Sequence, residues 1–112
     1  MLGKNQIGDL TIRPASSVIP ELVRDGAILP GALDNFGLGF ALNTGSVGTD
    51  RGVNTMAWAG IFNTFFWIDR EKQIGAVLMT QMLPFLDPGS QQLLEDFDRA
   101  VYAWRRTRSD VQ

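Results

Sequence analysis

Apolar residues recur with a period of two through the middle of the chain, which is the spacing of β-strands. Large and small residues alternate over Phe36–Asn43, as in a strand with one tightly packed face. Further strands are predicted over residues 54–60, 62–68 and 73–81, of which the second is rich in aromatic and β-branched residues. The short polar turn over residues 69–72 makes the last two strands antiparallel neighbours.

The period changes to three and four residues near the end of the chain, which predicts a helix. Asp87 is placed to cap this helix, and Pro88 is tolerated at its first position. One apolar stripe is predicted along it, made of Leu93, Leu94, Phe97, Val101 and Trp104.

Residues 1–35 lack either period and are interrupted by prolines and glycines. We therefore predict an irregular wrapping arm over residues 1–35 and a single partial domain over residues 36–112. Its predicted fold class is α+β, a three- to four-stranded antiparallel sheet with the C-terminal helix packed on one face.

Both faces of the predicted sheet are apolar. Phe62, Phe66 and Ile68 point to one face, whereas Phe65 and Trp67 point to the other. One helix covers one face, and each aromatic left in water forgoes about 1.5–3 kcal/mol of burial. The second face is expected to be covered by protein not encoded here or by another copy of the chain. The alternative is that the 35-residue arm folds back as the cover.

The composition narrows the possible chemistry. The 112 residues include no cysteine and no histidine, which excludes disulfides, thiol catalysis, the usual zinc sites and any Ser-His-Asp mechanism within the chain. The net charge of −2 provides no basic surface for nucleic acid. Gly37-Leu38-Gly39 lacks the third glycine of a dinucleotide fingerprint. We expect no cofactor, no metal and no nucleic-acid partner.

No apolar run approaches the roughly 18 residues of a membrane span, so no membrane association is expected. The first residues, Met1–Gln6, lack the apolar stretch of a secretory signal. The compartment stays open, with a cytoplasmic location favoured over a secreted one unless a signal lies on a part of the protein not present here.

Three segments carry a family resemblance, in the order Leu38-Gly39-Phe40, Met56–Asp69 and Ala76–Phe85. In this order they resemble the C-terminal segment of class C β-lactamase-like serine hydrolases, especially the family VIII carboxylesterases of the penicillin-binding-protein superfamily. The resemblance implies an incomplete part of the β-lactamase/transpeptidase-like fold.

Enzymes of this family work through three motifs, and only the third is found here. A Ser-x-x-Lys motif carries the nucleophile, and a Tyr-x-Asn or Tyr-x-Ser loop completes the proton relay. The third motif is often Trp-Gly-Gly or Trp-Ala-Gly in the esterase-like branch and matches Trp58-Ala59-Gly60. No serine is followed three residues later by lysine, and the single tyrosine, Tyr102, lies in the predicted helix. The chain therefore lacks both the nucleophile and the general base.

The resemblance also implies roles for the third motif. The backbone N–H of Ile61 would be an oxyanion donor, with Trp58, Ala59 and Gly60 lining the substrate. β-Lactamases carry lysine where Trp58 stands, so an uncharged ester or amide is expected rather than a penicillin. Gln81 is a further candidate for substrate contact. The alternative is that Trp58 is a core aromatic residue and Gly60 marks a bulge.

Two functions follow from these observations. The first is the C-terminal part of a β-lactamase-like serine hydrolase, inactive alone and complete only with an N-terminal catalytic part. The second is a non-catalytic, self-associating module or truncated relic of that family.

Overall fold

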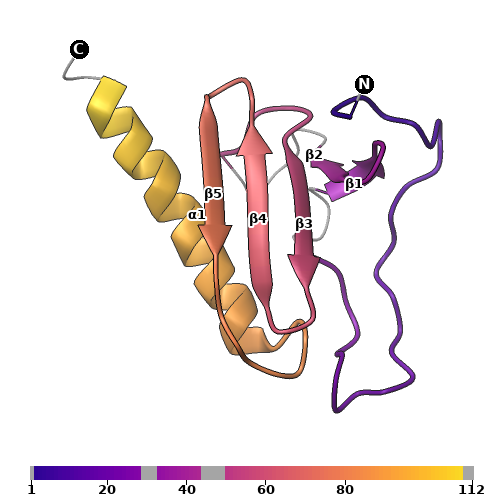
Figure 1. Cartoon of the computed structure of the whole chain (residues 1–112). Helices are drawn as coiled ribbons and strands as arrows, with labels where there is room; N and C mark the ends of the chain where they lie inside the picture. The colour runs from indigo at the N-terminus through magenta and orange to yellow at the C-terminus, as the bar shows by residue number, and fades with distance from the viewer. Residues whose placement is uncertain (1, 29–32, 44–49, 110–112) are drawn as a thin grey trace.

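The computed structural model describes residues 2–28, 33–43 and 50–109. They form a five-stranded antiparallel sheet followed by one helix, α1, over Pro88–Ser109 (Figure 1). The strands follow one another along the chain in the order in which they pair: β1 Leu33–Phe36, β2 Ala41–Asn43, β3 Met56–Gly60, β4 Thr64–Asp69 and β5 Ile74–Leu78. The predicted α+β class is confirmed, with five strands where three or four were expected.

The extra strand arises because the predicted strand over residues 36–43 is a hairpin. Its first half belongs to β1, which ends at Phe36, and its second half is β2. Gly37 N donates to Phe40 O at 2.8 Å, and Gly39 turns the chain with a φ of 102°, which favours glycine. β1 begins at Leu33, so the sheet starts inside the range predicted as the arm.

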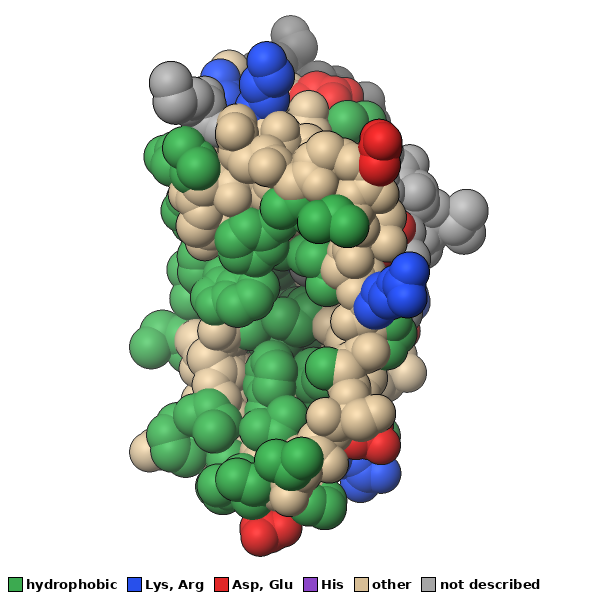
Figure 2. Space-filling model, turned by 90° about the vertical axis from the view of Figure 1, so that its right-hand side faces the viewer, with side chains coloured by type: hydrophobic (Ala, Val, Ile, Leu, Met, Phe, Trp, Pro, Cys, Tyr) green, Lys and Arg blue, Asp and Glu red, His purple; other side chains and the backbone are tan. Residues whose placement is uncertain are grey.

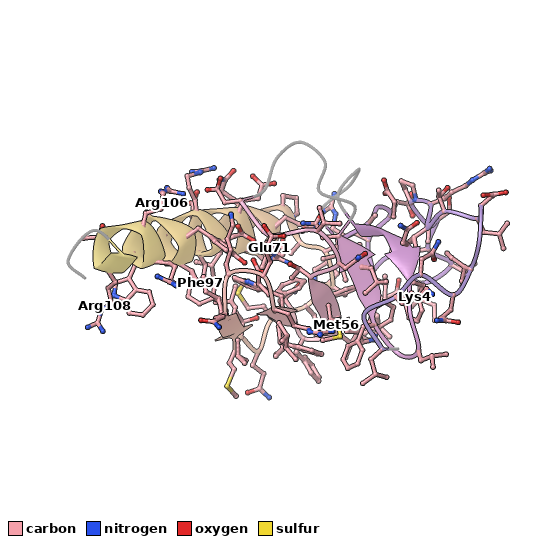
Figure 3. All side chains as sticks on the ribbon, turned by 90° about the horizontal axis from the view of Figure 1, so that it is seen from above. Lys4, Met56, Glu71, Phe97, Arg106 and Arg108 are labelled. Atoms are coloured by element: carbon pink, nitrogen blue, oxygen red, sulfur yellow. The ribbon has the colours of Figure 1, made fainter. Side chains whose placement is uncertain are left out.

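Helix α1 begins where the sequence predicted. The Ser90 amide donates to Asp87 Oδ2 at 3.1 Å, which is the expected cap, and Pro88 is the first helical residue. The helix lies diagonally behind the sheet in Figure 1, and Figure 3 shows it on one side of the sheet, with Phe97 between the two layers. The predicted packing on one face is therefore confirmed.

The apolar stripe of α1 differs from the prediction. Leu94 is buried, but Leu93 and Trp104 are exposed, while Asp98 and Tyr102 are buried in their place. The two polar residues can be buried because the rest of the chain supplies hydrogen-bond partners for them.

A buried polar network joins α1 to the sheet. The Arg51 guanidinium forms an ion pair with Asp98 and lies 4.0 Å from the ring centroid of Trp67. Burial lowers the pKa of Arg51, an effect that the Asp98 carboxylate opposes. The Trp67 indole donates to the Tyr102 hydroxyl at 3.1 Å. The Tyr102 hydroxyl in turn donates to Asp69 Oδ2 at 2.8 Å, which links the helix to the end of β4.

Asp69 is buried and accepts several hydrogen bonds. The amides of Gly52 and Lys72 donate to it at 2.9 Å each, in addition to the Tyr102 hydroxyl. Burial alone would raise the pKa of Asp69, but these three hydrogen bonds outweigh it, so the pKa lies below the usual value. Asp69 is thus a structural carboxylate that holds the turn after β4 against α1.

The opposite face of the sheet is largely exposed over β3, β4 and β5 in the described chain, whereas Leu42 and Met56 at its β2 end are buried. Trp58 of β3, Ile68 of β4 and Val77 of β5 are 47%, 41% and 57% exposed. Trp58 pairs with Phe66, and Phe66 pairs with Val77, so these side chains lie on the same face. Ile68 lies two residues further along β4 and therefore also points to this face. In Figure 3 the side chains of this face project away from the helix. We call it the open face.

The N-terminal arm lies beside the sheet and leaves most of the open face uncovered (Figure 1). Gln6 N donates to Phe36 O and Ile12 N to Asp34 O, both at 2.8 Å, which places the arm next to β1. Ala15 and Gly26 exchange two backbone hydrogen bonds of 2.9 Å within the arm. Within the described residues, no helix has the length and apolar character needed to cross a membrane.

Candidate functional site

The two halves of β3 have different neighbours. β4 pairs with all of β3, from Met56 opposite Ile68 to Gly60 opposite Thr64. β2 pairs with only the first two residues, Met56 and Ala57. The edge of β3 from residue 58 to residue 60 therefore extends beyond β2, and this is the Trp-Ala-Gly segment that the resemblance singled out.

Ile61 follows β3 as the first residue of a tight turn. Asn63 N donates to Gly60 O at 3.1 Å, and Asn63 has a φ of 62°. Because φ is not positive at Ile61 or Phe62, the turn from Gly60 to Asn63 is of type I. Among the described residues nothing accepts a hydrogen bond from the Ile61 amide, which leaves this N–H available as a donor.

The side chain of Asn63 fixes this turn to the segment that leads into α1. Asn63 is fully buried, and its Nδ2 donates to Met82 O and Pro84 O at 2.9 Å each. Its Oδ1 accepts from Leu86 N at 2.9 Å. Sequence reasoning did not single out Asn63; its position after Gly60 in a short hairpin was the available signal, since asparagine tolerates positive φ.

Gln81 is exposed and lies in a segment held against the same turn. The Thr80 hydroxyl donates to Phe62 O at 2.7 Å, and Met82 N donates to the same oxygen at 3.1 Å. The structure therefore brings the backbone at Gln81 next to the turn that carries Ile61.

Trp58 does not fit the alternative role of a core aromatic residue. Trp58 is about half exposed rather than a core residue, and its ring meets Phe36 edge-on with a centroid distance of 5.5 Å. Gly60 is the last paired residue of β3, opposite Thr64, where the type I turn and the positive φ of Asn63 form a G1-type bulge. Ala59 lies opposite Phe65 on the helix side and is partly buried. Trp58, Gly60 and Ile61 are thus surface positions at one free strand edge.

The groups needed to attack a carbonyl are not assembled in the described part of the chain. The described side chains of Ser16, Ser17 and Ser90 form no hydrogen bond with a lysine or tyrosine. Burial, followed by the hydrogen bond to Asp69, raises the pKa of Tyr102, so its phenol stays protonated and is held in the core. Tyr102 is therefore a structural residue and not a general base.

The fold and this free strand edge can be compared with known proteins. No family model matches the chain. The acyltransferase CalJ of Penicillium decumbens is 27% identical over 99 residues, which are 88% of this chain and 22% of CalJ. Simvastatin synthase LovD of Aspergillus terreus, in its LovD9 and LovD6 mutant forms, has a similar structure with a TM-score of 0.60 at 25% identity. The match covers 65% of this chain and 19% of each LovD chain.

The chain is similar to a part of acyl-transferring enzymes that have the β-lactamase/transpeptidase-like fold. The resemblance inferred from the sequence is thereby confirmed, and so is the assignment of the fold as part of the β-lactamase/transpeptidase-like architecture. The chain spans about a fifth of the length of the relatives that it matches. Both relatives are named as acyl-transferring enzymes or synthases, and this supports the superfamily rather than one particular activity of this chain.

Proposed function

We propose that this chain is the C-terminal part of a serine hydrolase or acyltransferase of the β-lactamase-like superfamily and acts on neutral ester or amide acyl donors. In this proposal it supplies the oxyanion-side strand, and the Ser-x-x-Lys and Tyr-x-Asn motifs lie on a complementary N-terminal part. The observation that carries the proposal is the free edge of β3, which ends at an Ile61 amide without an acceptor in the described chain.

The proposed chemistry follows from this amide. The serine oxygen of the complementary part attacks the carbonyl carbon, and the carbonyl π electrons move onto oxygen. That oxyanion accepts hydrogen bonds from the Ile61 N–H and from the amide of the nucleophile itself. When the carbonyl re-forms, the alcohol or amine leaves with the proton that the relay took from the serine hydroxyl, and the acyl group stays on the serine until water or an acceptor alcohol takes it up. Trp58 carries no charge, which fits an uncharged acyl donor.

The test measures hydrolysis of p-nitrophenyl esters by this chain alone and by its complex with a complementary part that contains Ser-x-x-Lys. We expect no turnover by the chain alone and turnover with an acylation burst by the complex. Ile61→Pro removes the N–H while the type I turn tolerates proline at this position. It should lower kcat of the complex by about 10²–10³-fold.

Ile61→Ala is the matched control, because it shortens the side chain but keeps the amide. Equal activities of Ile61→Pro and Ile61→Ala in the complex would refute the oxyanion role. Burst acylation by the chain alone would refute the division of the site between two parts.

The second candidate, a non-catalytic self-associating module, is favoured by one observation. The open face presents Trp58, Ile68 and Val77 to solvent, and β5 is an edge strand whose outer side has no strand partner among the described residues. Analytical ultracentrifugation distinguishes the two functions. A concentration-dependent homodimer that Val77→Lys disrupts, together with no complex with a complementary part, would select the module.

A further inference from the structure

A cavity of about 210 Å³ lies between the N-terminal arm and the half of the sheet that carries Trp58. Its apolar lining comes from three parts of the chain: the arm, the sheet and the segment before α1. The residues that matter here are Ile12, Val23 and Ile28 of the arm, Ala41 and Trp58 of the sheet, and Phe85. Figure 2, which views this side of the molecule, shows hydrophobic side chains gathered across its middle.

The arm is held in place around this cavity. Arg24 N donates to Phe85 O at 2.9 Å, and Phe85 N donates to Leu22 O at 2.8 Å, which fixes the arm to the segment before α1. The exposed residues Arg13 and Arg24 also border the cavity and mark its opening to solvent. The cavity is thus an apolar space with a polar rim, closed on one side by the arm.

The size and lining of the cavity restrict what can occupy it. An apolar cavity of roughly 150 Å³ binds benzene, so this one has space for about eight non-hydrogen atoms. Trp58 lies three strand residues before Ile61, a separation of about 10 Å. An ester held at the Ile61 amide could therefore extend a chain along the free edge of β3 to the cavity.

We propose that this cavity binds the short aliphatic chain of a neutral ester or amide substrate. The inference rests on the proposed function and adds the substrate class to it. Affinity should rise about fourfold for each CH₂ that enters the cavity and level off at about eight non-hydrogen atoms, when the space is full. Longer chains would have to project past the arginine rim.

The first experiment measures binding to the chain alone by ¹³C-methyl NMR, since binding does not need the nucleophile. One series is methyl ethanoate, butanoate, hexanoate and octanoate, and the other is butyl, hexyl and octyl ethanoate. We expect methyl shifts at Ile12, Val23 and Ile28 and the predicted chain-length profile in at least one series. The series whose affinity rises with chain length shows whether the acyl or the alcohol side of the ester occupies the cavity. An affinity that does not change with chain length in either series would overturn the proposal.

The blocking variant is Val23→Trp, which fills the cavity and should reduce binding at least tenfold. Val18→Trp is the matched control, because Val18 lies in the same arm but is 94% exposed and does not line the cavity. If Val23→Trp does not fold, the ¹³C-methyl shifts of the wild-type chain on adding ester test the location of the site. Shifts at Ile68 and Val77 of the open face instead of at the cavity residues would overturn the proposal.

Kinetics of the complex separate this inference from the proposed function. Esters that bind in the cavity with the expected profile but are never turned over would refute the proposed function and leave the cavity site standing. Turnover with kcat/KM independent of chain length and unchanged by Val23→Trp would refute the cavity site and leave the proposed function standing.

Discussion

The two faces of the sheet are built from alternate residues of the same strands, yet only one is a core. Phe65 and Trp67 point toward α1 and are 2% and 1% exposed, whereas Ile68, the next residue along, is 41% exposed. Apolar content does not separate the faces, since both are rich in large apolar residues. What distinguishes them, within the described residues, is the polar network of Asp69, Tyr102 and the Arg51 ion pair, which lies on the helix side. Polar partners therefore specify which face the helix covers.

The largest expected change in the free energy of unfolding comes from removing a buried side chain on the helix side. Phe65→Ala should lower the free energy of unfolding by about 3–5 kcal/mol, because it opens a cavity between the sheet and α1. Ile68→Thr keeps a β-branched residue in the same strand but on the open face, and should change stability by no more than about 0.5 kcal/mol. Urea denaturation of both variants measures the difference, and equal losses would mean that the two faces are equally buried in solution.

The next effect tests the polar network. Tyr102→Phe removes the hydroxyl that binds Asp69 and Trp67, and should cost about 1.5–3 kcal/mol because one of these partners is charged. Trp104→Phe is a matched substitution on the exposed side of the same helix and should be nearly neutral. Thermal unfolding followed by circular dichroism provides the measurement. A neutral Tyr102→Phe would show that apolar packing alone places α1.

Glycine substitutions probe the space available at the polar network and on the open face. A Cβ at Gly52 would lie 2.9 Å from Asp69 Oδ1, so Gly52→Ala should cost about 1–3 kcal/mol through crowding at the network. A Cβ at Gly75 on the open face would have no atom within 4 Å, so Gly75→Ala should change stability by no more than about 0.5 kcal/mol. Chemical denaturation of the two variants gives the comparison, which fails if their midpoints coincide.

The smallest effect is a pH dependence. The pKa of Asp69 is lower in the folded chain, so its contribution to stability is present above about pH 3.9, the pKa in an unfolded chain, and is lost as pH falls through the folded value. Tyr102→Phe removes one of the hydrogen bonds that lower this pKa. The stability difference between wild type and Tyr102→Phe should therefore shrink below about pH 4. A difference that stays constant from pH 6 to pH 2.5 would contradict this account.

Local signals in the sequence predicted much of the fold. Period-two alternation located β3, β4 and β5 within a few residues, and the Asp87-Pro88 pair located the start of α1. The pattern predicts one strand where the structure has the hairpin of β1 and β2, because alternation with small residues continues through the turn at Gly37 and Gly39.

The polar core of the fold was not predicted, because it depends on contacts between distant residues. Arg51 and Asp98 are 47 positions apart, and each looks like a surface charge in its own segment. Asp69 follows a strand in a polar turn, a position that usually indicates a solvated carboxylate. The free edge of β3 depends on where β2 ends, and this too is a property of pairing rather than of local sequence. The roles of Trp58, Ala59, Gly60, Ile61 and Gln81 as site residues stay predictions.

The Asn63 side chain couples the position of the segment before α1 to the position of the turn that carries Ile61. Its three hydrogen bonds join the turn that carries Ile61 to the backbone at Met82, Pro84 and Leu86. These bonds are buried, so breaking one would leave a polar group without a partner. A shift of this segment by about an ångström therefore moves the turn with it. Directed evolution of an assembled enzyme could therefore tune its rate through substitutions around residues 82–88, without altering any residue that meets the substrate.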